Sequence, residues 1–144
     1  MKVFISKSQD ETIDFGKNYA SNLQPGSVIG LKGNLGTGKT QFVKGVAAYF
    51  EVNEIVNSPT FLIVNEYVSN IGSNSGLKIF HFDLYRINSP DELSTIGFDE
   101  YFNDENSISL IEWSDLAEKF LNKHLKTVTF EYGEEENERI IKTE

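Results

Sequence analysis

The sequence contains no cysteine, only three prolines and only two arginines, Arg86 and Arg139, among its 144 residues. Without cysteine there can be no thiolate nucleophile, no cysteine-ligated zinc, no iron–sulfur cluster and no disulfide. No stretch approaches the roughly 18 consecutive apolar residues of a membrane-spanning helix, and the N-terminus lacks the apolar core of a signal peptide. We therefore expect a cytoplasmic protein that does not bind membranes.

Positive charge is also scarce, because 13 basic side chains face 22 acidic ones and the net charge is −9. Such a charge repels phosphate backbones and argues against binding of nucleic acids or anionic membranes by the chain alone. An anionic ligand would have to be held locally, by backbone amides or by one well-placed cation. The length and the 39% hydrophobic content fit one globular domain, residues 1–144.

Apolar periodicity and turn residues predict alternating strands and helices. Ser8 and Glu11 form a helix-capping pattern, and Pro25-Gly26 ends the helix that follows. The expected elements are a strand at 3–5, a helix from 9 to 23, a strand at 28–31, a helix at 42–50, strands at 61–68 and 77–84, a short helix from 90, a strand at 108–111, a helix at 116–121, and strands at 126–132 and 138–143. This order predicts an α/β layered fold whose mixed sheet has a parallel core and antiparallel flanking strands.

The most specific motif is Gly-Asn-Leu-Gly-Thr-Gly-Lys-Thr at residues 33–40. It matches the Walker A pattern of P-loop NTPases and lies between a predicted strand and a predicted helix, as that motif requires. Its glycines let backbone N–H groups surround an anion at a helix N-terminus, while Lys39 reaches the β- and γ-phosphates and Thr40 ligates Mg²⁺. The alternative is a glycine-rich turn with an exposed lysine. The expected phosphate-binding residues are Gly33, Asn34, Leu35, Gly36, Thr37, Gly38, Lys39 and Thr40.

The base of the nucleotide can be inferred from a missing motif. Guanine-specific proteins of this fold usually carry Asn-Lys-x-Asp, whereas the only Asn-Lys pair here, Asn122-Lys123, is followed by His124 and Leu125. Adenine, and hence ATP, is the better prediction.

Two acidic residues stand at the ends of predicted strands. Glu112 comes after the apolar run 108–111, as in a Walker B strand, and Asp83 comes after Phe82. Ligands collect at the carboxyl ends of parallel strands, so both acids are expected to face the phosphate loop. One would hold the magnesium shell and one would orient the attacking water. The structural alternative for each is a helix or turn cap.

Other polar and aromatic residues allow two interpretations each. His81 shares a strand face with Asp83, and a packed strand histidine is favoured over a ligand or base. Trp113 would point away from the face of Glu112 if the strand continued, and a core position competes with a contact to nucleotide or partner. Ser58-Pro59-Thr60 is either a simple turn or a switch segment whose hydroxyls sense the γ-phosphate.

Five separated motifs together resemble the TsaE family, formerly YjeE. They are GNLGTGKT at 33–40, SPTF at 58–61, HFDLYR at 81–86, DELSTIGFDEYF at 91–102 and IEW at 111–113. This family comprises small bacterial P-loop ATPases that act with TsaD and TsaB to make threonylcarbamoyladenosine on tRNAs that read ANN codons. The resemblance implies Mg²⁺-dependent ATP hydrolysis that is slow without those partners, and contact with tRNA only through the complex.

The resemblance also implies roles for single residues. Lys39 and Thr40 take the Walker A roles, Lys39 and Asp83 are catalytic, and Glu112 is both catalytic and linked to the magnesium. The residues implied around the rest of the nucleotide are Thr60 in the switch-like segment, Trp113, and Thr12 and Arg139 on either side of the base.

Two other functions compete with an ATPase subunit. A small-molecule kinase on the same loop would need several arginines to neutralise two phosphorylated substrates, and the chain has only Arg86 and Arg139. A nucleotide-dependent binding module without useful hydrolysis would not require Asp83 and Glu112, and both are present. The sequence therefore favours the ATPase.

Overall fold

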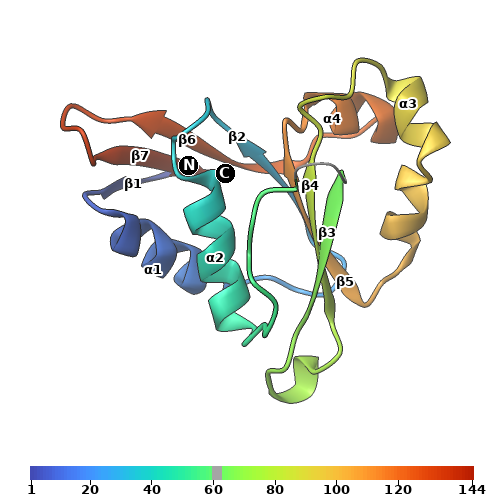
Figure 1. Cartoon of the computed structure of the whole chain (residues 1–144), viewed down its shortest axis with the longest axis horizontal. Coiled ribbons are helices and arrows are strands. Elements are labelled where there is room, and N and C mark those ends of the chain that lie inside the picture. Colours follow the sequence, from blue (N-terminus) through green and yellow to red (C-terminus); the bar gives the residue numbers. More distant parts are fainter. Residues whose placement is uncertain (60–62) are drawn as a thin grey trace.

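A computed structural model describes residues 1–59 and 63–144 of the chain. Within this part, seven strands form one sheet in the order β1-β7-β6-β2-β5-β4-β3 (Figure 1). The strands are β1 (Lys2–Ser6), β2 (Val28–Lys32), β3 (Val64–Val68), β4 (Lys78–Asp83), β5 (Ser107–Glu112), β6 (Lys126–Tyr132) and β7 (Arg139–Thr143). The helices are α1 (Gln9–Ala20), α2 (Lys39–Tyr49), α3 (Pro90–Thr95) and α4 (Asp115–Leu121), with short 3₁₀ segments η1 (Gly72–Asn74) and η2 (Phe98–Asn103).

The centre of the sheet is parallel and its flanks are antiparallel. β2 pairs in parallel with both β5 and β6, and β4 pairs in parallel with β5. β3, β7 and β1 are added in antiparallel fashion at the two ends. The predicted mixed α/β sheet and the predicted order of elements are confirmed. β3 begins only at Val64, later than predicted, and residues 60–62 lie outside the described part.

Helices cover the two faces of the sheet at different places. α1 and α2 cover one face of β2, β4, β5, β6 and β7, whereas α3, η2 and α4 pack against the other face at β4 and β5 (Figure 1). β4 is buried on both faces, since Ile79 belongs to the core under α2 and Phe80 belongs to the aromatic core under α3 and α4. Side chains two residues apart on a strand point to the same face, so His81 and Asp83 face α2 as Ile79 does.

Two glycines allow α1 and α2 to touch through their backbones. A Cβ atom on Gly45 would lie 2.0 Å from the carbonyl oxygen of Ile13, and one on Gly16 would lie 2.3 Å from that of Phe42. This close approach places the start of α1 beside the start of α2, where the side chain of Thr12 is 3.4 Å from the Cβ position of Gly38. None of the described helices is long and apolar enough to span a bilayer.

The helix contact yields a stability prediction. Gly45→Ala is expected to lower the free energy of unfolding by roughly 1–3 kcal/mol, because the new methyl group forces α1 and α2 apart. That loss exceeds the gain in helix propensity, which is at most about 1 kcal/mol. Urea unfolding measures the change in the free energy of unfolding. Lys44→Ala, at an exposed position of the same helix, is the control. A Gly45→Ala protein more stable than the parent would contradict this close packing.

Candidate functional site

The glycine-rich loop of residues 33–38 connects β2 to α2. Gly38 has φ +104° and precedes the first residue of α2, and no side chain caps this helix N-terminus. The first N–H groups of α2 are consequently available to an acceptor in front of the helix. Gly33 has φ +153°, and a Cβ atom there would lie 2.6 Å from the carbonyl oxygen of Phe130, so the loop runs tightly along β6.

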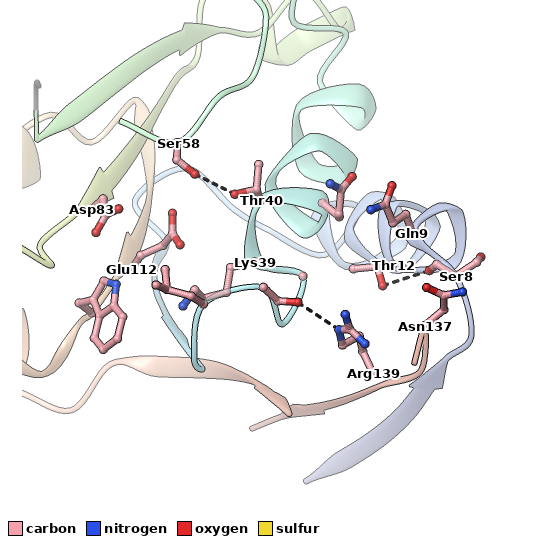
Figure 2. A pocket seen from close by; sticks show the side chains of 15 residues that line it. Ser8, Gln9, Thr12, Lys39, Thr40, Ser58, Asp83, Glu112, Asn137 and Arg139 are labelled. Atoms are coloured by element: carbon pink, nitrogen blue, oxygen red, sulfur yellow. Dashed lines mark hydrogen bonds between the residues drawn. The ribbon is translucent and has the colours of Figure 1, made fainter. Parts of the chain in front are cut away.

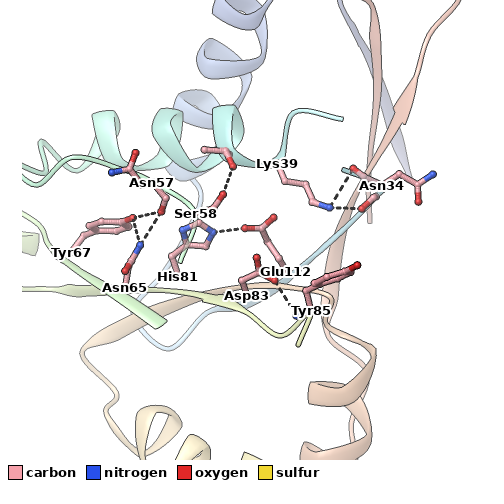
Figure 3. Close-up of polar contacts among 12 residues, drawn as sticks. Asn34, Lys39, Asn57, Ser58, Asn65, Tyr67, His81, Asp83, Tyr85 and Glu112 are labelled. Atoms are coloured by element: carbon pink, nitrogen blue, oxygen red, sulfur yellow. Dashed lines mark hydrogen bonds and ion pairs between the residues drawn. The ribbon is translucent and has the colours of Figure 1, made fainter. Parts of the chain in front are cut away.

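Lys39 is the buried cation of this site, with 5% of its surface exposed. Its Nζ donates to the backbone carbonyl of Gly33 and, at 3.4 Å, to that of Asn34 (Figure 3). The same atom lies 4.9 Å from the ring centroid of Trp113. Burial lowers the pKa of Lys39, while the negative charges of Glu112 and Asp83 act in the opposite direction. The ammonium is thus poorly hydrated and held by neutral oxygens and an aromatic face.

The last hairpin, β6 and β7, holds the tip of the loop. The hydroxyl of Tyr132 donates to the carbonyl of Leu35, and Nε of Arg139 donates to the carbonyl of Gly36 at 3.2 Å. The guanidinium of Arg139 lies 5.1 Å from the ring centroid of Tyr132. No local pattern in the sequence signals this contact, because about a hundred residues separate the hairpin from the loop.

Asp83 and Glu112 lie opposite each other at the carboxyl ends of β4 and β5. Glu112 is 4% exposed, and its Oε2 is 2.7 Å from Nε2 of the fully buried His81. Oδ1 of Asp83 accepts a hydrogen bond of 3.0 Å from the backbone N–H of Tyr85, so Asp83 caps a turn and also lines the cavity. The favoured reading of His81 as a packed, hydrogen-bonded strand residue agrees with this geometry.

The environment of Asp83 raises its pKa. Burial is the main cause, and the charge of Glu112 adds to it. The hydrogen bond from Tyr85 and the charges of His81 and Lys39 lower the pKa and offset part of the shift. Asp83 is therefore a stronger proton acceptor, once ionised, than an exposed aspartate.

Trp113 does not continue β5. Its φ of +58° turns the chain directly after Glu112. Its ring packs against the core under α3 and α4, lies 5.1 Å from the ring of Tyr85, and lines the same cavity as Lys39.

These groups surround a cavity of about 380 Å³ (Figure 2). The predicted residues that line it are Thr12, Leu35, Gly36, Gly38, Lys39, Thr40, Asp83, Glu112, Trp113 and Arg139. Gly33, Asn34 and Thr37 belong to the loop but do not line it, and Thr60 lies outside the described residues. Ser58 also lines it, in agreement with the switch-segment interpretation of Ser58-Pro59-Thr60. The lining residues that the sequence did not indicate are Ser8, Gln9, Gln41 and Asn137.

The arrangement suits a polyanion with a hard cation. Loop amides and Lys39 can hold the anion, and the oxygens of Thr40 and Glu112 can contribute to a cation site. Among the described residues no cluster of three or more His, Cys, Asp or Glu side chains can hold a metal ion. This donor set fits Mg²⁺, which takes one or two protein carboxylates and completes its shell with phosphate and water.

Comparison with known proteins assigns the family. The sequence pattern of the family described as "Threonylcarbamoyl adenosine biosynthesis protein TsaE" matches residues 6–141. The tRNA threonylcarbamoyladenosine biosynthesis protein TsaE of Bacillus subtilis (strain 168) is 39% identical over 130 residues, which cover 90% of this chain and 77% of that protein. The protein of the same name from Haemophilus influenzae is 38% identical over 123 residues, covering 82% and 74%.

A solved structure agrees with the sequence matches. The crystal structure of YdiB from Bacillus subtilis superposes with a TM-score of 0.77 at 30% identity, over 99% of this chain and 83% of that one. The matched region includes the glycine-rich loop, both carboxylates and the last hairpin. The chain therefore belongs to the TsaE family of threonylcarbamoyl adenosine biosynthesis proteins.

Proposed function

We propose that this protein binds ATP with Mg²⁺ in the cavity at the glycine-rich loop, hydrolyses it, and thereby supports threonylcarbamoyladenosine modification of tRNA together with TsaD and TsaB. The observation that carries the proposal is the convergence of Lys39, Thr40, Asp83 and Glu112 on one cavity. These four come from three separate segments of the chain, and each has a residue type that phosphoryl transfer requires.

Phosphate binding would use the loop and Lys39. The Lys39 ammonium now donates to two backbone carbonyls, and phosphate oxygens are stronger acceptors for the same hydrogens. Thr40 and Glu112 would hold the magnesium ion, which when bound neutralises phosphate charge. Thr12 and Arg139 line the cavity on its α1 and β7 sides and would flank the base.

Water activation would be the task of Asp83. Its raised pKa brings the carboxylate nearer to the range of an effective proton acceptor. The hydrogen bond from Tyr85 fixes one oxygen of this cavity-lining carboxylate. A small-molecule kinase has less support, because Arg86 is exposed and outside the cavity lining, and Nε of Arg139 is engaged by Gly36.

The partner proposal rests on charge and on the family. A chain with net charge −9 lacks the field that would bind tRNA directly, so contact with tRNA would run through protein partners. The relatives are named for threonylcarbamoyladenosine biosynthesis, and TsaD and TsaB are the partners that similarity to the family implies.

Lys39→Ala is expected to lower ATP affinity by at least tenfold, because it removes the one cation that reaches the phosphates. Isothermal titration calorimetry with Mg·ATP measures the loss. Lys44→Ala, an exposed lysine on the same helix, is the matched control and should bind like the parent. If Lys39→Ala bound and hydrolysed ATP like the parent, the glycine-rich loop would not be the phosphate-binding loop.

The carboxylates are expected to affect turnover more than affinity. Asp83→Asn and Glu112→Gln should each reduce the rate of phosphate release about 100-fold or more while leaving ATP affinity within a few-fold. Glu112→Gln should in addition raise the Mg²⁺ concentration needed for half-maximal rate. Asp115→Asn removes an exposed carboxylate close to Glu112 in the chain and should leave the rate unchanged. If Asp83→Asn and Glu112→Gln released phosphate as fast as Asp115→Asn and the parent, both assignments would be wrong.

Association with partners should depend on nucleotide. We expect slow ATP hydrolysis by the chain alone and faster hydrolysis with TsaD and TsaB from the same source, because a γ-phosphate contact orders segments that ADP releases. Phosphate release and gel filtration, each with ATP, with ADP and without nucleotide, are the measurements. Tight tRNA binding without both proteins, or no association in any nucleotide state, would contradict the proposal.

A further inference from the structure

Ser58 lies in the connection between α2 and β3 and faces the start of α2. Its Oγ is 2.9 Å from Oγ1 of Thr40, the residue assigned above to the magnesium ion (Figure 2). Both side chains line the cavity that also contains Asp83 and Glu112. A second hydroxyl oxygen is thus presented to the position at which Thr40 would hold a cation.

The sheet holds Ser58 in this place through its neighbour. The carbonyl of Asn57 accepts a hydrogen bond of 2.8 Å from Nδ2 of Asn65 and one of 3.3 Å from the hydroxyl of Tyr67, both on β3 (Figure 3). Tyr67 is 2% exposed, and Asn65 pairs with His81, the hydrogen-bond partner of Glu112. The backbone next to Ser58 is therefore held to β3, the strand that pairs with β4 and its Asp83.

The spacing of the two hydroxyls fits a shared cation. Mg²⁺ binds oxygen at about 2.0–2.1 Å in octahedral geometry, which places neighbouring ligand oxygens about 2.9 Å apart. The distance between the Thr40 and Ser58 oxygens is 2.9 Å. A hydrogen bond between two hydroxyls has a similar length, so the distance is compatible with both roles and an experiment must separate them.

Building on the proposed function, we propose that the Ser58 hydroxyl is a direct ligand of the divalent cation, next to Thr40, with ADP as well as with ATP. Ser58 reaches the site through Thr40, a Walker A residue that would hold the cation in either nucleotide complex, so the cation would not need a γ-phosphate to recruit Ser58. Ser58 itself would then be tied to the cation in both nucleotide states. This role differs from a sensor of the γ-phosphate, which would engage only with ATP.

The first measurement is the affinity of the ADP complex for Mn²⁺, followed by the electron paramagnetic resonance signal of free Mn²⁺. Ser58→Ala should weaken Mn²⁺ binding by about tenfold or more. Loss of an outer-shell partner of Thr40 could lower the affinity as much, so this result is necessary and the Cd²⁺ measurement below identifies direct ligation. A melting temperature close to that of the parent controls for folding. Because ADP is not hydrolysed, the readout does not depend on activity.

The second measurement uses the absence of cysteine from the chain. Ser58→Cys introduces a single thiol, and a thiolate ligand prefers a soft cation such as Cd²⁺ over Mg²⁺. Stoichiometric Cd²⁺ with ADP should produce the ultraviolet thiolate-to-cadmium charge-transfer band in Ser58→Cys. Ser94→Cys, an exposed position on α3, is the matched control and should show no such band.

Both results are required. Mn²⁺ affinity of Ser58→Ala within twofold of the parent, or a Cd²⁺ band no stronger in Ser58→Cys than in Ser94→Cys, would overturn direct ligation and reduce Ser58 to a hydrogen-bond partner of Thr40. A parent protein that binds neither ADP nor Mn²⁺ would instead overturn the proposed function, and this inference with it. Binding by the parent together with unchanged Ser58 variants would overturn the inference alone.

Discussion

The parallel pairing of β5 with β2 on one side and β4 on the other is the constraint on which the candidate site depends. In this register Leu31 lies opposite Glu112, and Glu112 lies opposite Asp83. All three strands end at the same edge of the sheet, so the loop after β2 and the two carboxylates meet there. A shift of β4 or β5 by one residue would turn Asp83 or Glu112 to the other face, into the aromatic core under α3 and α4.

The site is less acidic than the chain as a whole, because its lining pairs two cations, Lys39 and Arg139, with two carboxylates, Asp83 and Glu112. The chain is strongly acidic as a whole, yet its cavity concentrates the features that favour an anion: the N-terminus of α2, the buried ammonium of Lys39 and the guanidinium of Arg139. Burial lowers the pKa of Lys39, the negative charges of Glu112 and Asp83 oppose that shift, and the ammonium is packed on Trp113. Negative charge elsewhere on the surface does not remove this local preference, because interactions between exposed charges are screened within about 10 Å.

Local features of the structure were predictable from the sequence, and contacts between distant segments were not. The loop at 33–40, the capping of α1 by Ser8 and the hairpin of β6 and β7 follow from short patterns whose geometry is set by neighbouring residues. The pairing of His81 with Glu112 depends on which strand lies beside β4, which periodicity does not reveal. The hydrogen bonds from Tyr132 and Arg139 to the loop likewise depend on β6 lying next to β2, which the sequence pattern does not reveal. The turn at Trp113 could not be predicted, because a positive φ is usually indicated by glycine and here the residue is a tryptophan.

The central claim is that this cavity binds a nucleotide through its phosphates, and Trp113 provides the most direct measurement of it. Trp113 is the only tryptophan of the chain and its ring lies 4.9 Å from Nζ of Lys39. Its fluorescence should therefore respond to any ligand that engages that ammonium. Titration with Mg·ATP and with Mg·ADP is predicted to give a saturable change in emission, and adenosine is predicted to give none. No saturable change with either nucleotide, or an equal change with adenosine, would contradict the account.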